Sequence, residues 1–333
     1  MKRNRVTALF AALLLCLCVL AGCGEDDYPI RPDKPNAATS SDSGSEAGQE
    51  QGEQERQEEN IPAGTVFSPP PVKAGKYQME TSSLQKFDYL YGGQTYQSLS
   101  EDIRYIYNID MSKEKNGWKA EFSFARIYYT SVSAGNSSVL FDTQDESYKD
   151  DSTAPWYNLV GQKFTVKYDE KLQVKSISGV DKILQKYPDT AEITSADSLK
   201  AIAAEAIFAL PDMEYKKPFD KTHMVSDSQD VDLTYTPVKQ SGRLLRLDVS
   251  TEAQPVLPAD ESDEAGTIHY TSGDKLSGTL WINLDNRMLF ESTKIIKYYS
   301  ELTPTADEGD NQQTVVFDCV ITISNTSTCA ARK

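Results

Sequence analysis

The sequence is poor in the side chains on which metal centres and histidine-based catalysis depend. It has two histidines, His223 and His269, and five cysteines among 333 residues. Cys-x-x-Cys, His-Glu-x-x-His and Gly-x-Ser-x-Gly motifs are absent, and so is a glycine-rich phosphate loop. We therefore predict no metal site, no cofactor and no catalytic residue from motifs. The sequence says more about where the protein sits than about its chemistry.

Basic residues are also scarce relative to acidic ones. The chain has 34 Lys and Arg against 50 Asp and Glu, for a formal net charge of −16. A nucleic-acid partner requires a concentrated surplus of Lys and Arg to neutralise phosphates. We therefore exclude nucleic acid as a partner.

Residues 1–22 have the organisation of a secretory signal. Basic residues stand within the first five positions, and an apolar stretch follows that is too short to span a bilayer comfortably. It ends in Leu-Ala-Gly-Cys at residues 20–23, which resembles the lipobox of bacterial lipoproteins. The resemblance implies cleavage before Cys23, lipidation of its thiol with chains such as palmitate, and attachment to the extracytoplasmic face of the cell membrane. The alternative is an ordinary signal peptide or an uncleaved anchor that happens to hold a cysteine.

Residues 23–71 read as an acidic, disordered tether. Between residues 24 and 60 there are 11 acids and three bases, with almost no large apolar side chains. Such a segment cannot bury enough surface to offset the entropy of ordering it. Residues 61–71 are proline-rich and should form a stiffer approach to the folded part. A spacer is the favoured function, and binding of cations or a partner by the acidic run is the alternative.

Residues 72–333 are expected to form one β-rich α+β domain. Residues 103–111 and 118–128 alternate apolar and polar side chains, and Asn116-Gly117 between them is a hairpin signal. A second hairpin is predicted over residues 164–177, around Asp169. The remaining predicted strands cover residues 244–250, 267–271, 279–284, 288–299 and 314–324.

Two helices are predicted in the middle of this domain. One covers residues 179–187 and stops at Pro188. The other opens at Thr194 or Ser195, where Thr194-Ser195-Ala196-Asp197 resembles a capping box, and ends before Pro211. Its apolar side chains recur at helical spacing, which predicts packing across a sheet.

Two segments of the domain resemble each other. Residues 164–174 align without gaps to residues 280–290, and both read as strand, Asp-led turn and strand. Two similar sheet units, 72–210 and 211–333, would explain the match. A generic hairpin signature would explain it equally well.

The central stretch resembles a family of uncharacterised bacterial lipoproteins, the DUF6263-type family. The resemblance rests on Asn-Leu-Val-Gly-Gln-Lys-Phe-Thr-Val at residues 158–166, Val-Lys-Ser-Ile-Ser-Gly-Val-Asp-Lys-Ile at residues 174–183, and Leu-Pro after a helix. Members typically have glycine where this chain has Lys171 and Arg287, and a different segment where it has residues 216–220. The resemblance implies curved antiparallel sheets with one or two helices over a concave apolar face, similar to lipoprotein carriers, and supplies no activity.

Aromatic residues and two late cysteines are the remaining candidates for a site. The aromatics on the first predicted hairpin suit a concave pocket for a lipid or glycan, and they suit ordinary half-exposed sheet as well. These candidate ligand-facing residues are Tyr105, Tyr107, Trp118, Phe122 and Phe124. A disulfide between Cys319 and Cys329 is a further hypothesis, because cysteines outside the cytoplasm tend to pair.

Two functions fit these observations. The favoured hypothesis is a non-enzymatic, lipid-anchored protein of the cell envelope with a binding or structural role, holding an amphiphilic ligand on the sheet. The alternative is an envelope hydrolase that uses a carboxylate pair, since acids are plentiful and such a pair needs no histidine. No pair is selected by the sequence.

Overall fold

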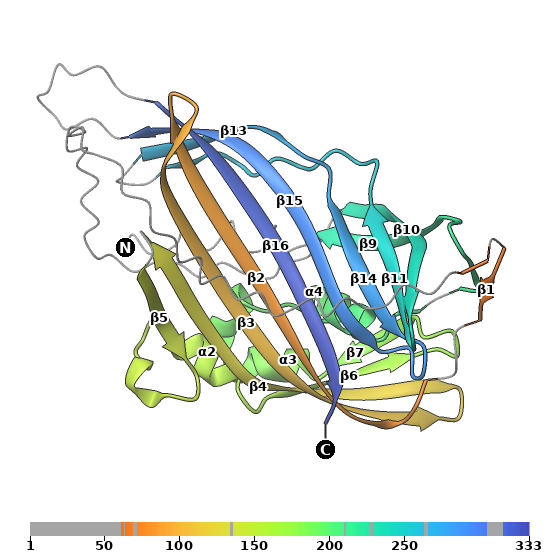
Figure 1. Cartoon of the computed structure of the whole chain (residues 1–333). Coiled ribbons are helices and arrows are strands. Elements are labelled where there is room, and N and C mark those ends of the chain that lie inside the picture. The colour runs from red at the N-terminus through yellow and green to blue at the C-terminus, as the bar shows by residue number, and fades with distance from the viewer. Residues whose placement is uncertain are drawn as a thin grey trace, which may run out of the picture.

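A long curved antiparallel sheet dominates the described part of the computed structural model, and three helices of that part lie on its concave side (Figure 1). The structure describes residues 61–62, 64–68, 72–133, 136–209, 211–226, 229–262, 266–304 and 316–332. The predicted signal segment, Cys23 and the acidic run up to residue 60 lie outside this range. The α+β class, with curved antiparallel sheet and few helices, is confirmed.

The described elements follow one another along the chain with few helices between strands. The strands are β1 (Val66–Phe67), β2 (Gly75–Tyr91), β3 (Gln94–Glu114), β4 (Gly117–Ser133), β5 (Asn136–Asp142), β6 (Lys163–Tyr168), β7 (Val174–Ser178), β8 (Met213–Glu214), β9 (Phe219–Ser226), β10 (Gln229–Ser241), β11 (Leu244–Ser250), β12 (Glu261–Ser262), β13 (Gly266–Gly273), β14 (Ser277–Asn283), β15 (Leu289–Pro304) and β16 (Phe317–Ala331). The helices are α2 (Ala154–Leu159), α3 (Val180–Lys186) and α4 (Ala196–Ala206), with 3-10 turns η1 (Glu146–Tyr148) and η2 (Pro188–Glu192).

One sheet joins both ends of the folded region. Its strand order is β7-β6-β4-β3-β2-β16-β15-β14-β11-β10-β9, with β5 beside β4, β13 beside β15 and β12 beside β13. The central pairing of β2 with β16 is antiparallel and runs from Tyr77 opposite Ala331 to Leu90 opposite Asp318. The two stretches suggested as sub-units, 72–210 and 211–333, therefore contribute strands to one continuous sheet.

Both predicted hairpins are present. The first turns at Lys115-Asn116, and Gly117 follows with a φ of 134°. A Cβ on Gly117 would meet the Tyr168 carbonyl oxygen at 2.1 Å, so both the conformation and the space require glycine there. In the second, the Asp169 carboxylate accepts from the backbone N–H groups of Lys171 and Gln173, each at 2.9 Å.

Glycine is typical of the family at two turn positions, Lys171 and Arg287, and one of the two has the left-handed backbone that glycine favours. Arg287 has a φ of 57°, in the left-handed region that favours glycine. In the β6–β7 turn the left-handed residue is Leu172, at 68°, and not the expected Lys171. The reason is that the Asp169 cap extends over Lys171 and places the reversal one residue later.

The predicted helices are confirmed, with a correction to the cap of α4. Ser195 is the N-cap, and its hydroxyl accepts from the Ser198 N–H while the Ser198 hydroxyl accepts from the Ser195 N–H. Ser198 thus closes the capping box in place of Asp197, whose carboxylate instead accepts from Lys200 Nζ at 2.6 Å. The apolar side of α4 is buried as expected, at Leu199, Ile202, Ala203 and Ala206.

Some strands were not predicted, and the folded part begins earlier than residue 72. Strand β2 was missed because its inward positions are polar in the middle, so apolar and polar residues do not alternate. Strands β5, β9 and β10 were also missed. Before residue 72, β1 pairs with β8, and Phe67 is buried in the core. A two-residue strand among prolines gives no periodic signal.

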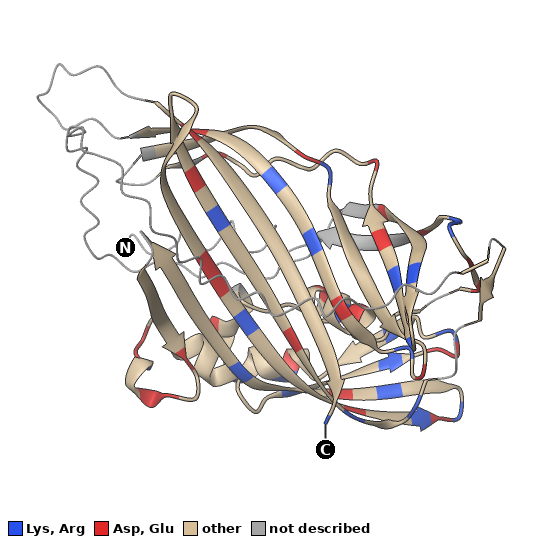
Figure 2. Cartoon of the chain, in the orientation of Figure 1, with Lys and Arg blue, Asp and Glu red and all other residues tan. Residues whose placement is uncertain are grey.

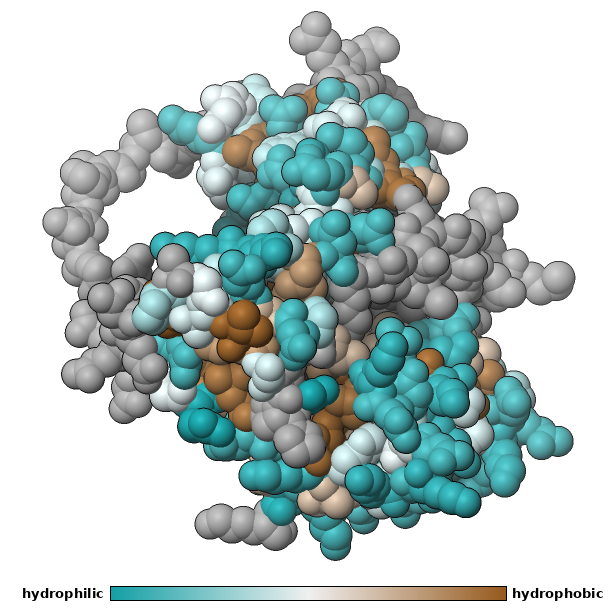
Figure 3. Space-filling model, turned by 90° about the vertical axis from the view of Figure 1, so that its right-hand side faces the viewer, coloured by the Kyte–Doolittle hydropathy of each residue, from teal (hydrophilic) through white to brown (hydrophobic). Residues whose placement is uncertain are grey.

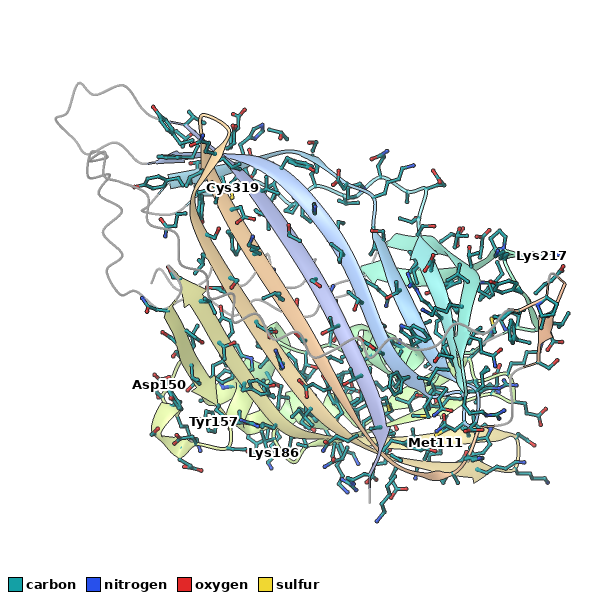
Figure 4. The ribbon with its side chains drawn as sticks, in the orientation of Figure 1. Met111, Asp150, Tyr157, Lys186, Lys217 and Cys319 are labelled. Carbon is teal, nitrogen blue, oxygen red and sulfur yellow. The ribbon has the colours of Figure 1, made fainter. Side chains whose placement is uncertain are left out.

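The buried apolar residues form two separate clusters. The main core contains α2, α3 and α4 together with strands on either side of the central β2–β16 pair, and it includes Met79, Met111 and Phe164. The upper apolar cluster consists of Tyr270, Ile296, Tyr298, Cys319, Ile321 and Ile323, with Phe87, Tyr89 and Ile268 packed against it. Figure 4 places Met111 and Cys319 near opposite ends of the long strands. Within the described residues, no helix has the length and hydrophobicity needed to cross a bilayer.

Candidate functional site

A band of polar side chains separates the two apolar clusters on the inner face of the sheet. Side chains alternate along a strand, so Thr81 and Ser83 share the face of Met79 in the main core. The registers place further polar residues beside them on β16 and β15. This polar band comprises Thr81, Ser83, Gln85, Asn325, Ser327, Ser292 and Lys294.

The band is arranged in cross-strand rows. Thr81 lies opposite Ser327, and Ser327 lies opposite Ser292 on β15. One step further along the strands, Ser83 lies opposite Asn325, which lies opposite Lys294. Such rows are about 7 Å apart, because two residues of a strand rise that far. The band is therefore a compact group of polar side chains between the two apolar clusters of the inner face.

Most of these polar side chains are buried. Thr81 is 8% exposed, Ser83 4%, Gln85 2% and Ser292 1%. Burying a polar group without a hydrogen bond costs free energy, so a set of them on the inner face requires an explanation. Among the described residues the hydroxyl oxygens of Thr81 and Ser83 have no hydrogen-bond partner.

An ion pair lies at the edge of the polar band that faces α4. Lys294 Nζ donates to Glu205 Oε2 at 2.9 Å, and the Ser292 hydroxyl also donates to the Glu205 carboxylate. Both charged side chains are largely buried, with 15% of Lys294 and 21% of Glu205 exposed. Glu205 thus anchors the last turn of α4 to β15 and neutralises the band's cation.

A second carboxylate borders the band on β3. Glu101 lies opposite Gln85 and faces inward, and the Tyr129 hydroxyl donates to its Oε2 at 2.6 Å. Burial raises the pKa of the Glu101 carboxyl above its usual range, and the Tyr129 hydrogen bond opposes that effect. Glu101 therefore holds a proton more readily than an exposed glutamate.

The upper apolar cluster begins directly beyond the band. The Gln85 row continues to Ile323 and Ile296, and the next row holds Phe87, Ile321 and Tyr298. Among the described residues this cluster is built from strand side chains alone, whereas helices cover the main core. Along the inner face, the helix-covered main core is followed by the polar band and then by the upper apolar cluster, which contains no described helix residue and whose side chains are 1–9% exposed.

The five predicted ligand-facing aromatics belong to the main core. Tyr105, Tyr107, Phe122 and Phe124 are between 0 and 3% exposed, and Trp118 packs partly buried against the same core. Tyr107 lies 5.1 Å from Phe124 between ring centroids, and Phe122 stacks on Phe164 at 4.9 Å. They share one face, as the alternation predicts, and they pack there against one another and against Phe164.

The predicted Cys319–Cys329 disulfide is wrong. Both cysteines are free and buried. They lie ten residues apart on β16, which separates them by about 33 Å along an extended strand, far beyond disulfide reach. Cys319 belongs to the upper apolar cluster and Cys329 to the main core. Burial raises the pKa of the Cys319 thiol to about 11 and that of Cys329 to about 12.

The described residues contain no cluster of His, Cys, Asp and Glu suited to a metal ion. His269 is exposed, and its Nδ1 lies 2.8 Å from an Asp260 carboxylate oxygen at the surface. Its outward position agrees with the strand interpretation. The side chain of His223 and the predicted lipidation site Cys23 lie outside the described part of the chain.

The outer face of the sheet is charged and internally paired. Figure 2 shows both signs of charge spread along the long strands. Two guanidinium groups lie near the Tyr128 ring, Arg126 at 4.6 Å and Arg104 at 5.6 Å from its centroid, and both arginines pair with carboxylates. On another side of the molecule, the one that lies to the right in Figure 1, Figure 3 shows hydrophobic residues at the surface between hydrophilic ones. In the described residues, the polar band on the inner face is the more unusual feature.

The comparisons address the family and the fold. A sequence model of a family of unknown function, DUF6263, matches residues 115–236. The predicted resemblance to this family is confirmed over these residues. The DUF6263 region covers β4 to β9 and part of β10, so it contains Glu205 but excludes β2, β15 and β16.

The other two comparisons add little beyond this family match. No curated protein matches the chain. Among solved structures, one entitled "Lipid-protein interactions in lipovitellin" is similar at 7% identity and a TM-score of 0.45, over 79% of this chain and 26% of that one. The chain thus spans about a quarter of the length of that structure.

The polar band was missed by sequence reasoning. Its signal was present as the run Thr81-Ser82-Ser83-Leu84-Gln85, which has polar residues on both faces of what the structure shows to be a long strand. Such a run reads as a loop when strands are found by apolar alternation. The band is recognisable only once β16 is known to lie beside β2.

Proposed function

We propose that this protein is a lipid-anchored envelope protein that binds an amphiphile on the inner face of its sheet. The observation that carries the proposal is that polar and apolar side chains lie directly beside each other on that face. A buried polar band with unpartnered hydroxyls borders an apolar cluster that no described helix covers. An amphiphile presents the same two chemistries in the same order.

The location in this proposal rests on the N-terminal sequence. A basic start, a short apolar stretch and Leu-Ala-Gly-Cys support cleavage and lipidation at Cys23. The acidic residues up to 60 would be repelled by anionic lipid and hold the domain away from the membrane surface. The ligand would then be taken up by a domain tethered near, but not inserted in, the bilayer.

The binding energy would come from the upper apolar cluster. The side chains of this cluster are themselves only 1–9% exposed, so the apolar surface removed from water would be mainly that of the acyl chains. Such burial contributes roughly 25 cal/mol per Å² and provides affinity without specificity. The polar band would set the orientation, because an acyl chain placed there would leave hydroxyls and amides without partners. The ligand would therefore bind with its head toward α4 and its tail toward Cys319.

Lipid extraction tests this proposal. The full chain is purified in mild detergent, and non-covalent lipid is extracted with organic solvent and quantified by mass spectrometry. We expect about one lipid per protein, and several-fold less in an Ile296→Phe, Ile321→Phe double variant that fills the inner face. Val320→Phe, on the opposite face of β16, is the matched control and should retain the lipid. Absence of lipid from the wild-type extract would refute the ligand part.

The anchor is tested with the same preparations. Cys23→Ser should lose incorporation of labelled palmitate and leave the membrane fraction. Retention of the variant in membranes would contradict the proposed anchoring and leave the ligand question to the extraction experiment.

The alternative of a carboxylate-pair hydrolase gains no support from the described residues. The inward carboxylates Glu101 and Glu205 bind to β4 and β15, which have three strands between them. Neighbouring strands lie about 4.8 Å apart, so these two groups are well beyond the roughly 5–9.5 Å at which paired carboxylates act on a glycoside.

A further inference from the structure

The unpartnered hydroxyls of the polar band carry an inference about the head group of the ligand, which rests on the proposed function. Thr81 Oγ1 and Ser83 Oγ have no hydrogen-bond partner among the described residues, and both side chains are more than nine-tenths buried. They stand two positions apart on one face of β2, roughly 7 Å from each other. A buried hydroxyl left without a partner costs about 1–3 kcal/mol, so a bound group that pairs with both would be favoured.

A hydroxyl can donate one hydrogen bond and accept others. A ligand group that also both donates and accepts hydrogen bonds therefore pairs with it best. The residues beside these two are of the same kind, with Ser327 opposite Thr81, Asn325 opposite Ser83, and Gln85 next on β2. Hydroxyl and amide side chains offer mixed donors and acceptors without net charge. This set matches the hydroxyl groups of a sugar or of glycerol.

The charges around the band oppose an anionic head group. The cation of the band, Lys294, is already paired with Glu205 at 2.9 Å. Glu101 borders the band at Gln85 and is an acid with a raised pKa. A phosphate placed between Glu101 and Glu205 would be repelled by both carboxylates wherever they are ionised, and the charge of Lys294 is already balanced by Glu205.

The length of the inner face suits an acyl chain. From Ser83 the face continues past Gln85 and Phe87 to Tyr89, six residues and roughly 20 Å along β2. One leaflet of a bilayer is about 15 Å deep, half of the hydrocarbon thickness. Acyl chains attached to a head group at Ser83 would therefore lie within the upper apolar cluster.

We propose that the polar band binds an uncharged, hydroxyl-bearing head group of a lipid whose acyl chains lie on the upper apolar cluster. Such a head group is a glycosyl unit or the free glycerol hydroxyl of a diacylglycerol. Thr81 and Ser83 each exchange a hydrogen bond with it, and Gln85 marks the border to the acyl chains.

Competition between lipids with identical chains tests this assignment. The full chain is mixed with phosphatidylcholine vesicles that contain dioleoylglycerol, monoglucosyl-dioleoylglycerol or dioleoylphosphatidylglycerol, and displacement of a fluorescent diacylglycerol is followed. We expect the better of the two uncharged lipids to bind about 10-fold more tightly than the phosphatidylglycerol. Preference for the glucosyl lipid would identify a sugar, and preference for dioleoylglycerol would identify the free glycerol hydroxyl, which the glucosyl lipid lacks.

Variants of the polar band test the binding of the head group separately from the binding of the acyl chains. Thr81→Val with Ser83→Ala should fold as the wild type does, because neither hydroxyl has a described partner, and should weaken the uncharged lipids about 5-fold or more, equivalent to one or two hydrogen bonds of about 1 kcal/mol each. Thr326→Val with Ser324→Ala, on the outer face of β16, is the matched control. Melting temperatures of both variants verify folding.

Several outcomes would overturn the assignment in distinguishable ways. Equal affinity for phosphatidylglycerol, or unchanged binding in the Thr81, Ser83 double variant, would refute the head-group assignment while lipid binding stands. Binding of no lipid by the wild type would refute the proposed function itself. Binding only after deletion of residues 24–60 would assign the inner face to the chain's own tether.

Discussion

Some polar residues of the inner face are buried, and burial changes their ionisation. Glu101 is the clearest case, because its pKa is raised by burial and only partly lowered by the Tyr129 hydroxyl. A carboxyl whose pKa is higher in the folded than in the unfolded state stabilises the fold when it is protonated. That contribution is fully present below the unfolded pKa and is lost as the pH rises through the folded one.

Glu101→Gln should remove this pH dependence. The amide keeps an acceptor for Tyr129 and cannot ionise, so the variant should gain stability relative to the wild type as the pH rises from about 4 to about 7. Urea unfolding at several pH values measures the difference in the free energy of unfolding. Glu170→Gln, at an exposed carboxyl in the β6–β7 turn, should show little change. A difference that shrinks with rising pH would contradict the assigned direction.

At the scale of elements, prediction from sequence succeeded where one face of a strand is apolar throughout. Strands β3 and β4 and their Asn-Gly turn follow from apolar alternation and turn chemistry. Helix α4 follows from its cap and its apolar spacing. Strand β2 did not follow, because Thr81, Ser83 and Gln85 occupy positions that a packed core would fill with apolar side chains. The strand that the sequence did not predict is therefore the one that carries the candidate site.

The turns give a direct test of element geometry. Arg287 and Leu172 both have left-handed backbone, which costs a non-glycine residue about 1–2 kcal/mol. Arg287→Gly should relieve that strain and, after the higher entropy of glycine in the unfolded chain, stabilise the protein by about 0.5 kcal/mol. Leu172→Gly should instead destabilise it by about 2–3 kcal/mol, because the Leu172 side chain is 3% exposed in the main core.

Thermal and urea unfolding of the two turn variants give these differences. Both substitutions relieve the same backbone conformation, but Leu172→Gly removes a fully buried side chain, whereas the Arg287 side chain is only partly buried. Equal destabilisation by both would contradict the left-handed geometry at Arg287.

At the scale of the whole molecule, the decisive contact joins parts of the chain that no local pattern relates. Strand β2 begins at Gly75 and β16 ends at Ala331, and their pairing forms the centre of the sheet. Register between strands so far apart depends on the packing of the entire sheet, so the polar band cannot be read from either strand alone. The N-terminal location signals, in contrast, are local, and the sequence yields them without a fold.

The sheet and its helices also explain why the ligand is proposed at one end. Helices α2, α3 and α4 complete the main core, and Glu205 fixes α4 at the border of the polar band. Beyond that border the inner face carries the upper apolar cluster, near the end of the strands at which Figure 4 labels Cys319. One half of the inner face therefore packs against the helices, and the other half is the proposed ligand-binding half.

Photo-crosslinking with a lipid that carries a diazirine at the end of its acyl chain tests this division most directly. The full chain is loaded from vesicles, irradiated and digested, and the modified peptides are identified by mass spectrometry. The account predicts crosslinks on the inner positions of the upper apolar cluster, at Ile296, Tyr298, Ile321 and Tyr89. Crosslinks confined to the outer face, or to main-core residues such as Phe122 and Phe164, would contradict it.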